Sequence, residues 1–145
     1  MSKKLSPRLE EIVNALPLYK SIRVLEIGCG PGVAAREIAN RIGDGYILAI
    51  DRSAKAIQQA VKNSEAEIKS GCLSFRQVAI EDFELEAGEK PYDIAFAVRV
   101  GALDGRHPKV GALALPRIAK ALTENGKLYI DGGDPLKELP FDDFR

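Results

Sequence analysis

The sequence predicts an α/β fold in which helices cover both faces of a parallel sheet with the strand order 3-2-1-4-5. Two observations carry this prediction. Short apolar runs that suit buried strands alternate with segments whose apolar residues recur at helical spacing, a pattern typical of parallel strands joined by right-handed crossovers. The first apolar run also leads into a glycine-rich turn, Gly28 to Gly32, and then into a helical segment. Ligands bind such sheets at the carboxyl ends of the strands, beside the switch point between strands one and four.

The length and the charge of the chain limit the classes of protein to which it can belong. One domain is expected over residues 1–145, with an N-terminal helical segment in residues 1–20 and a tail in residues 134–145. Lys plus Arg and Asp plus Glu both number 21, so bulk charge gives no signal for nucleic acid or a membrane surface. No apolar stretch is long enough to span a membrane and no signal core follows Met1, so a cytoplasmic protein is expected.

Cysteine and histidine are scarce in this chain. The two cysteines, Cys29 and Cys72, are expected to be free thiols, because they show no metal-ligand spacing. His107 is the one histidine, which leaves no cluster for a transition-metal site. No metal is therefore expected.

The first half of the chain carries signals for two strands and three helices. Ser6 is expected to cap a helix whose first position is Pro7, and Pro17 ends that helix. Strand one, a helix and strand two follow, at about residues 22–27, 33–42 and 46–50. Ser53 can cap the next helix, whose buried side is expected to hold Ile57, Ala60, Val61 and Ile68.

The second half carries signals for three more strands. Strands three and four are expected at about residues 73–79 and 92–98, joined by an acidic loop or one short turn. A helix from Val110 to Leu122 follows, with a kink or a late start at Pro116, because proline disrupts a helix interior. The turn at Asn125 and Gly126 then leads into strand five, at about residues 127–130.

The glycine-rich turn and two acidic residues predict a nucleotide-like ligand. The spacing is Gly-x-Gly-x-Gly, and Val33 stands where the pattern Gly-x-Gly-x-x-Gly requires its last glycine. Glu26 lies two residues before the first glycine of the turn. Asp51 ends strand two, where nucleotide-binding α/β folds place a carboxylate on a ribose. Together these features favour a ligand in the crevice beside strand one.

The stretch Leu25-Glu26-Ile27-Gly28-Cys29-Gly30-Pro31-Gly32 resembles the glycine motif of class I S-adenosylmethionine-dependent methyltransferases. The order of the later segments is similar to that family from about Ser21 to Gly133. The resemblance implies a three-layer Rossmann-like fold, here truncated, with S-adenosylmethionine as the cofactor. It also implies methyl transfer, and we expect a small-molecule acceptor.

The resemblance implies roles for the residues of the crevice. The backbone of Gly28, Cys29, Gly30 and Gly32 would approach the amino-acid end and ribose of the cofactor. Glu26 would favour its ammonium group, although a loop cap or a partner of a helix N-terminus is the structural alternative. Asp51 would accept hydrogen bonds from both ribose hydroxyls, with a helix cap as its alternative. The remaining cofactor candidates are Arg52, Ile80, Glu81, Asp82 and Val98.

Two features concern adenine and the acceptor. The family commonly has an acidic residue where this chain has Ala79, so Glu81 or Asp82 is expected to supply that carboxylate unless both lie in a solvated loop. The loop after strand four lacks the Asn/Asp-Pro-Pro-Tyr type of sequence, which argues against an amino-group methyltransferase acting on bases or glutamine. In that loop, Asp104 and His107 are candidates for a base or orienter, and Arg99 and Arg106 are candidates for holding an acidic acceptor. After strand five, Asp131 and Asp134 are candidates at the mouth of the crevice. An ordinary polar loop is their alternative.

Two further hypotheses stay open at this point. One is a non-catalytic methyltransferase-like domain that binds S-adenosylmethionine or acts as an interaction module. The other is a nicotinamide-dinucleotide domain, against which Glu26 and the missing last glycine count.

The C-terminal tail determines whether strand five has a further strand beside it. Residues 132–145 contain two prolines and four acids and make a poor source of two more strands. Strand five is therefore expected at the sheet edge, covered by apolar tail residues or by a second copy of the chain in a homodimer.

Overall fold

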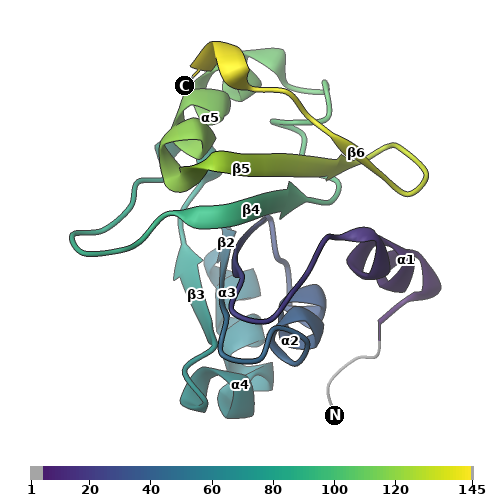
Figure 1. Ribbon diagram of the computed structural model, residues 1–145, viewed down its shortest axis with the longest axis vertical. Helices are drawn as coiled ribbons and strands as arrows, with labels where there is room; N and C mark the ends of the chain where they lie inside the picture. The colour runs from purple at the N-terminus through teal and green to yellow at the C-terminus, as the bar shows by residue number, and fades with distance from the viewer. Residues whose placement is uncertain (1–4, 145) are drawn as a thin grey trace.

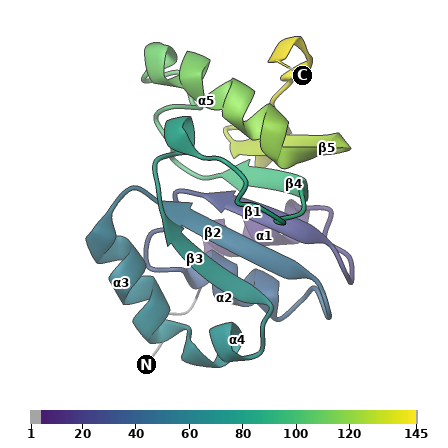
Figure 2. The same cartoon turned by 90° about the vertical axis from the view of Figure 1, so that its left-hand side faces the viewer.

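The structure is a computed structural model, which describes residues 5–144. One sheet of six strands crosses the molecule in the order β3-β2-β1-β4-β5-β6 (Figures 1 and 2). The strands are β1 (Arg23–Ile27), β2 (Tyr46–Asp51), β3 (Leu73–Gln77), β4 (Tyr92–Ala97), β5 (Leu122–Asp131) and β6 (Leu136–Glu138). The first five are parallel and β6 is antiparallel to β5. The predicted order of the five parallel strands is confirmed, with the switch point between β1 and β4.

Helices lie on both faces of the sheet (Figure 2). They are α1 (Pro7–Ala15), α2 (Val33–Ala39), α3 (Ala54–Asn63), α4 (Glu65–Lys69) and α5 (Pro108–Ala121), with 3-10 turns η1 (Ile80–Asp82) and η2 (Asp142–Phe144). Side chains alternate between the faces along each strand. In β1, Val24 joins the core cluster that contains residues of α1 and α2, whereas Leu25 and Ile27 join the cluster that contains residues of α5. The three layers therefore enclose two cores, one on each face.

Local capping signals set the starts of two helices as the sequence predicts. The Ser6 hydroxyl accepts a hydrogen bond from the backbone N–H of Leu9 at 3.2 Å, with Pro7 in the first helical position. The Ser53 hydroxyl accepts one from the backbone N–H of Ala56 at 3.1 Å. Such caps satisfy N–H groups that the helix leaves without partners.

Two helix predictions need correction. The helix after Ser53 breaks at Ser64 into α3 and α4, and the side chain of Val61 is 43% exposed instead of buried. The helix before β5 begins at Pro108 and runs through Pro116, so of the two expected alternatives, a kink or a late start at Pro116, the late start is wrong. Its buried face, which includes Ala114 and Ile118, packs into the core and compensates for the backbone hydrogen bond that proline cannot make.

The expectation that β5 ends the sheet is also wrong. Tyr129 pairs with Glu138 and Asp131 with Leu136, so β6 covers the edge of β5. The reversal depends on Gly133, because a Cβ there would lie 2.2 Å from the carbonyl oxygen of Leu136. The new edge strand has only three residues, two of them charged, which are features that discourage pairing with other chains.

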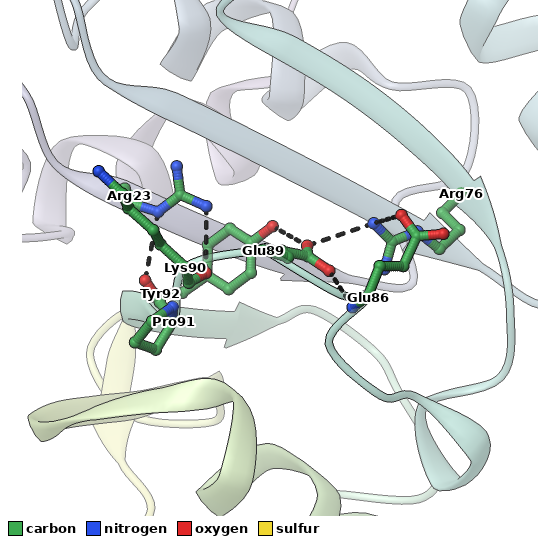
Figure 3. A network of polar contacts seen from close by, with 7 residues as sticks. All are labelled: Arg23, Arg76, Glu86, Glu89, Lys90, Pro91 and Tyr92. Carbon is green, nitrogen blue, oxygen red and sulfur yellow. Dashed lines mark hydrogen bonds and ion pairs between the residues drawn. The ribbon is translucent and has the colours of Figure 1, made fainter.

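A polar network anchors the connection between η1 and β4, which contains no helix (Figure 3). The carboxylate of Glu89 accepts hydrogen bonds from the hydroxyl of Tyr92, the guanidinium of Arg76 and the backbone N–H of Glu86. Arg23 lies over the ring of Tyr92, 4.9 Å from its centroid, and donates to the carbonyl oxygens of residues 90 and 91. These contacts fix the segment that follows η1. Residues of η1 itself contribute to the site described below.

Candidate functional site

The glycine turn after β1 is built from three residues in the left-handed region. The φ angles of Gly28, Gly30 and Gly32 are 75°, 54° and 84°. The backbone N–H of Gly28 donates to the carbonyl oxygen of Ile50 at 2.8 Å, which ties the turn to the end of β2. Glycine suits all three positions, because residues with a Cβ rarely adopt positive φ.

The space around Gly30 differs from the space around Gly32. A Cβ on Gly32 would lie 2.9 Å from Cζ of Phe75 and 3.2 Å from Cβ of Ala60, so this glycine permits the packing of α2. A Cβ on Gly30 would meet no atom within 4 Å. The space beside Gly30 is therefore open to a ligand, whereas that beside Gly32 is filled by the protein.

Asp51 connects β2 to the glycine turn. Its Oδ2 accepts a hydrogen bond from the backbone N–H of Gly30 at 2.9 Å, and its Oδ1 accepts one from the backbone N–H of Ser53 at 2.9 Å. The cap of α3 is Ser53, so the helix-cap alternative for Asp51 does not hold. Each carboxylate oxygen keeps acceptor capacity beyond its one backbone bond.

Glu26 is a buried carboxyl group on the sheet face that α1 and α2 cover. The residue is 5% exposed, and within residues 5–144 its Oε1 atom has no hydrogen-bond partner. Burial, and next the charge of Asp51, raise the pKa of Glu26 to about 8. An ammonium group of a ligand would compensate such a carboxylate, since a buried charge needs an opposite charge or hydrogen bonds.

The thiol of Cys29 is a poor nucleophile in this environment. Cys29 is buried, and burial raises its pKa, with the charges of Glu26 and Asp51 acting in the same direction. A thiol with a raised pKa stays protonated and unreactive. Cys29 can therefore contribute through its backbone, as the sequence suggests.

A cavity of about 430 Å³ opens at the carboxyl ends of the strands, within the size range of small-molecule sites. Its lining comes from the ends of β1 and β2, from the residues around η1 and from the loop between β4 and α5. The lining residues are Ile27, Gly28, Ile50, Asp51, Arg52, Val78, Ala79, Ile80, Glu81, Arg99, Val100, Gly101, Ala102, Arg106, His107 and Val110.

The cavity brings together many of the predicted site residues and omits others. Those that line it are Gly28, Asp51, Arg52, Ile80, Glu81, Arg99, Arg106 and His107. Those outside its lining are Glu26, Cys29, Gly30, Gly32, Asp82, Val98 and Asp104. Because Glu81 lines the wall and Asp82 does not, Glu81 is the better placed of the two acids for a contact to adenine.

Sequence reasoning missed most of the apolar wall. Val78, Val100, Ala102 and Val110 line the cavity although their residue types carry no chemical signal. A Cβ on Gly28 would lie 2.7 Å from Cγ2 of Val100, so the loop after β4 closes directly onto the glycine turn. The rule that ligands bind at carboxyl ends of strands pointed to this loop, but it could not select these side chains.

The loop between β4 and α5 is ordered by internal polar contacts. Both carboxylate oxygens of Asp104 accept hydrogen bonds from Nε of Arg106, at 3.0 and 2.8 Å. The hydrogen bond from Arg106 lowers the pKa of Asp104. An acid held in this way is a weak general base, because a good base has a pKa near the working pH. His107, which lines the cavity, is the better placed of the two candidates.

A buried arginine supports the glycine turn from the side of α2. Arg36 is 7% exposed, and its Nη1 donates to the carbonyl oxygen of Pro31 at 2.9 Å and to the hydroxyl of Ser64 at 3.0 Å. This contact joins the turn to the junction of α3 and α4. Sequence reasoning missed Arg36, because its spacing places it on an ordinary helix.

Two other features are absent from residues 5–144 of the structure. No helix in that part of the chain is long and apolar enough to cross a bilayer. The same residues contain no group of three or more His, Cys, Asp or Glu side chains that could hold a metal ion.

The residues present fit a cofactor with an ammonium group and a nucleoside. Glu26 has a buried carboxylate oxygen without a partner, Gly30 lies beside open space, and Asp51 has free acceptor capacity at the end of β2. Apolar side chains between β2, η1 and the loop after β4 suit a flat ring. This fold and this site are those of the class I S-adenosylmethionine-dependent methyltransferases.

Residues 18–144 match the model of a family described as "Methyltransferase domain". The chain belongs to this family. It is 28% identical over 128 residues to trans-aconitate 2-methyltransferase of Methylobacterium nodulans, covering 88% of this chain and 45% of that protein. It is 28% identical over 135 residues to the O-methyltransferase rstn1 of Aspergillus nomiae, covering 89% and 56%. The chain therefore spans about half the length of the curated relatives it matches.

Solved structures agree with the fold. One is a methyltransferase from Thiobacillus denitrificans in complex with S-adenosyl-L-homocysteine, described as S-adenosylmethionine (SAM) dependent. Its TM-score is 0.66 at 23% identity, and the match covers 90% of this chain and 50% of that one. This likeness supports the architecture of the three layers.

Proposed function

We propose that the chain binds S-adenosylmethionine in the cavity at the carboxyl ends of β1, β2 and β4 and transfers its methyl group to a small molecule. The observation that carries the proposal is the position of Asp51. Its carboxylate accepts a hydrogen bond from the backbone N–H of Gly30, and the residue also lines the cavity. Membership in the methyltransferase domain family supports the same function.

The cofactor would lie along the wall from the glycine turn to η1. Asp51 accepts hydrogen bonds from the ribose hydroxyls, since an ionised carboxylate is an acceptor only. Ile50, Arg52 and Ile80 flank the adenine, and Glu81 accepts from its amino group. Glu26 compensates the ammonium group, directly or through water, next to the backbone of Gly28 and Gly30.

The protein's contribution to the reaction is positioning and exclusion of water. When bound, the cofactor supplies an activated methyl group on a sulfonium for in-line displacement. The walls formed by Ile27, Ile50 and Val100 exclude water and hold the reacting groups in line. A general base is needed only if the acceptor must lose a proton, and His107 is the residue best placed to take it.

A small-molecule acceptor fits both the cavity and the relatives. The volume of about 430 Å³ matches a small ligand. Two of the relatives above are named for trans-aconitate or for O-methyl transfer. The competing hypothesis is a domain that binds S-adenosylmethionine without catalysis, which the same experiment addresses.

Thermal-shift titration tests the proposal. S-adenosylmethionine and S-adenosylhomocysteine should raise the melting temperature and NAD should not, with about 2.7 kcal/mol of stabilisation at a hundred times the dissociation constant. Stabilisation by NAD alone would contradict the proposal. A second arm incubates the protein with S-adenosylmethionine and a metabolite extract. S-adenosylhomocysteine formation that depends on the extract supports catalysis, and its absence in a protein that binds the cofactor favours the non-catalytic hypothesis.

The quaternary state and the location stay predictions. Because β6 covers the edge of β5, the structure no longer gives a reason to expect a homodimer through that edge. A contact through the C-terminal tail is still proposed, and light scattering on the purified protein tests it. A cytoplasmic location is proposed from the sequence alone.

A further inference from the structure

Arg99, the second residue after β4, has a backbone conformation that is uncommon for its type. Its φ is +58°, and the only other described non-glycine residue with positive φ is Ser21. Two contacts hold Arg99 there. Its backbone N–H donates to Oδ1 of Asp131 at 3.0 Å, and its carbonyl oxygen accepts from Nη2 of Arg106 at 2.9 Å. The neighbouring elements thus fix Arg99 at the wall of the cavity in a conformation that a Cβ disfavours.

The side chains of Arg99 and Arg106 differ in charge balance. The guanidinium of Arg106 pairs with the carboxylate of Asp104, with a closest distance of 2.8 Å, so its charge is compensated within the loop. The guanidinium of Arg99 has no hydrogen bond or ion pair with any other residue in the described range 5–144. Both residues line the cavity, but only Arg99 brings an uncompensated cation to it from this loop.

The other charged groups of the cavity lie on its nucleoside side. Asp51 and Arg52 follow β2, and Glu81 belongs to η1. The carboxylate of Asp51 already accepts two backbone hydrogen bonds. Arg99 lies across the switch point from them, after β4, with Val100 between it and Gly101 in the wall. An anion beside Arg99 would therefore not compete with the groups assigned to the cofactor.

We propose that the methyl acceptor carries a carboxylate and that Arg99 binds it. This proposal rests on the proposed function, because it assumes that the cofactor occupies the side of Asp51. A guanidinium presents a planar fork of donors that matches a carboxylate with two parallel hydrogen bonds. The fixed backbone of Arg99 sets the point on the cavity wall from which its side chain extends. The anchored carboxylate orients the acceptor, so that its nucleophilic group faces the glycine turn.

Calorimetry in the presence of saturating S-adenosylhomocysteine tests the proposal. The probes are succinate, citrate and trans-aconitate, each compared with its neutral methyl ester. The variants are Arg99→Gln, which removes the charge but keeps an unbranched polar side chain with a Cβ at the same positive φ, and Arg99→Lys, which keeps the charge but loses the fork. Arg8→Gln is the matched control, because Arg8 is an exposed arginine of α1 outside the cavity.

At least one of the acids should bind the wild-type protein and its ester should not. Arg99→Gln should weaken that binding at least tenfold, Arg99→Lys should recover part of the loss, and Arg8→Gln should change nothing. Affinity for S-adenosylhomocysteine should stay within about twofold in all three variants. Failure of all three acids to bind, equal binding of the esters, or unchanged binding in Arg99→Gln would overturn the proposal. Failure of S-adenosylhomocysteine to bind the wild-type protein would instead refute the proposed function.

Discussion

The carboxylate of Asp51 accepts a hydrogen bond from the backbone N–H of Gly30 at 2.9 Å. This bond joins the end of β2 to the turn after β1, two strands that lie side by side and run parallel. A side chain that shapes the turn is therefore the same side chain that the proposed function assigns to the ribose. Removing it should disturb both the ligand contact and the surface on which the ligand lies.

Asp51→Ala should weaken binding of S-adenosylhomocysteine more than Asp82→Ala does. Asp51 lines the cavity and Asp82 does not. Loss of hydrogen bonds to a charged group costs about 1.5–3 kcal/mol, roughly a 10- to 150-fold change in the dissociation constant. Calorimetry on both variants measures the difference. Equal losses, or a larger loss for Asp82→Ala, would refute the assignment.

Gly30→Ala and Gly32→Ala should separate ligand binding from stability. Both variants place a Cβ at positive φ, at a cost of about 1–2 kcal/mol. Only Gly32→Ala also meets Phe75, at 2.9 Å, and such overpacking costs about 1–3 kcal/mol more. Gly30→Ala should retain most of its stability and lose affinity for S-adenosylhomocysteine at least tenfold. Denaturant unfolding and calorimetry check this, and a larger stability loss in Gly30→Ala would count against it.

The raised pKa of Glu26 predicts a pH-dependent stability. An ordinary glutamate has a pKa near 4.5, whereas burial raises the pKa of Glu26 in the folded protein to about 8. Between these values the folded state binds the extra proton, so its stability falls as pH rises, by about 1.4 kcal/mol per unit at most. Glu26→Gln removes this term. The variant should gain stability over the ligand-free wild type as pH rises from 5.5 to 8.

Urea unfolding of both proteins at pH 5.5, 7 and 8 measures that difference. A difference that stays constant across these pH values would show that Glu26 titrates normally. A companion measurement uses the ligand. If the ammonium of S-adenosylhomocysteine favours ionised Glu26, binding near pH 7 should release protons, which calorimetry in buffers of different ionisation enthalpy detects.

Arg36→Met should destabilise the protein and weaken ligand binding together. Arg36 is buried and donates to the carbonyl oxygen of Pro31, which belongs to the glycine turn, and to Ser64. Leaving these acceptors without a donor costs about 1–3 kcal/mol. The control is Arg41→Met, which removes a solvent-accessible ion pair with Glu37, worth about 0–1 kcal/mol, and a hydrogen bond to Asn14. Normal ligand affinity in Arg36→Met would show that Arg36 contributes to stability but not to the shape of the ligand site.

Local sequence signals determined much of the fold. Ser6 and Ser53 cap helices because a hydroxyl can reach the third N–H beyond it, which needs no information from distant residues. The glycines of the turn and the alternation of strands with helices are likewise local patterns, and they predicted the parallel sheet and its crevice. Asp51 and Gly28 were predicted with the site and both line the cavity, because carboxyl ends of neighbouring strands meet at one edge.

Tertiary structure decided what depends on contacts between distant segments. The pairing of β6 with β5 needs a reversal at Gly133 and a partner strand, and neither follows from the composition of the tail. The anchoring of the Arg99 backbone by Asp131 is also tertiary, whereas Arg106 pairs with Asp104 two residues away. Both are arginines of one loop, but Asp104 neutralises one, while Asp131, at the end of another strand, holds the backbone of the other. Charge balance depends on which groups come within a few ångströms, and folding alone determines that distance.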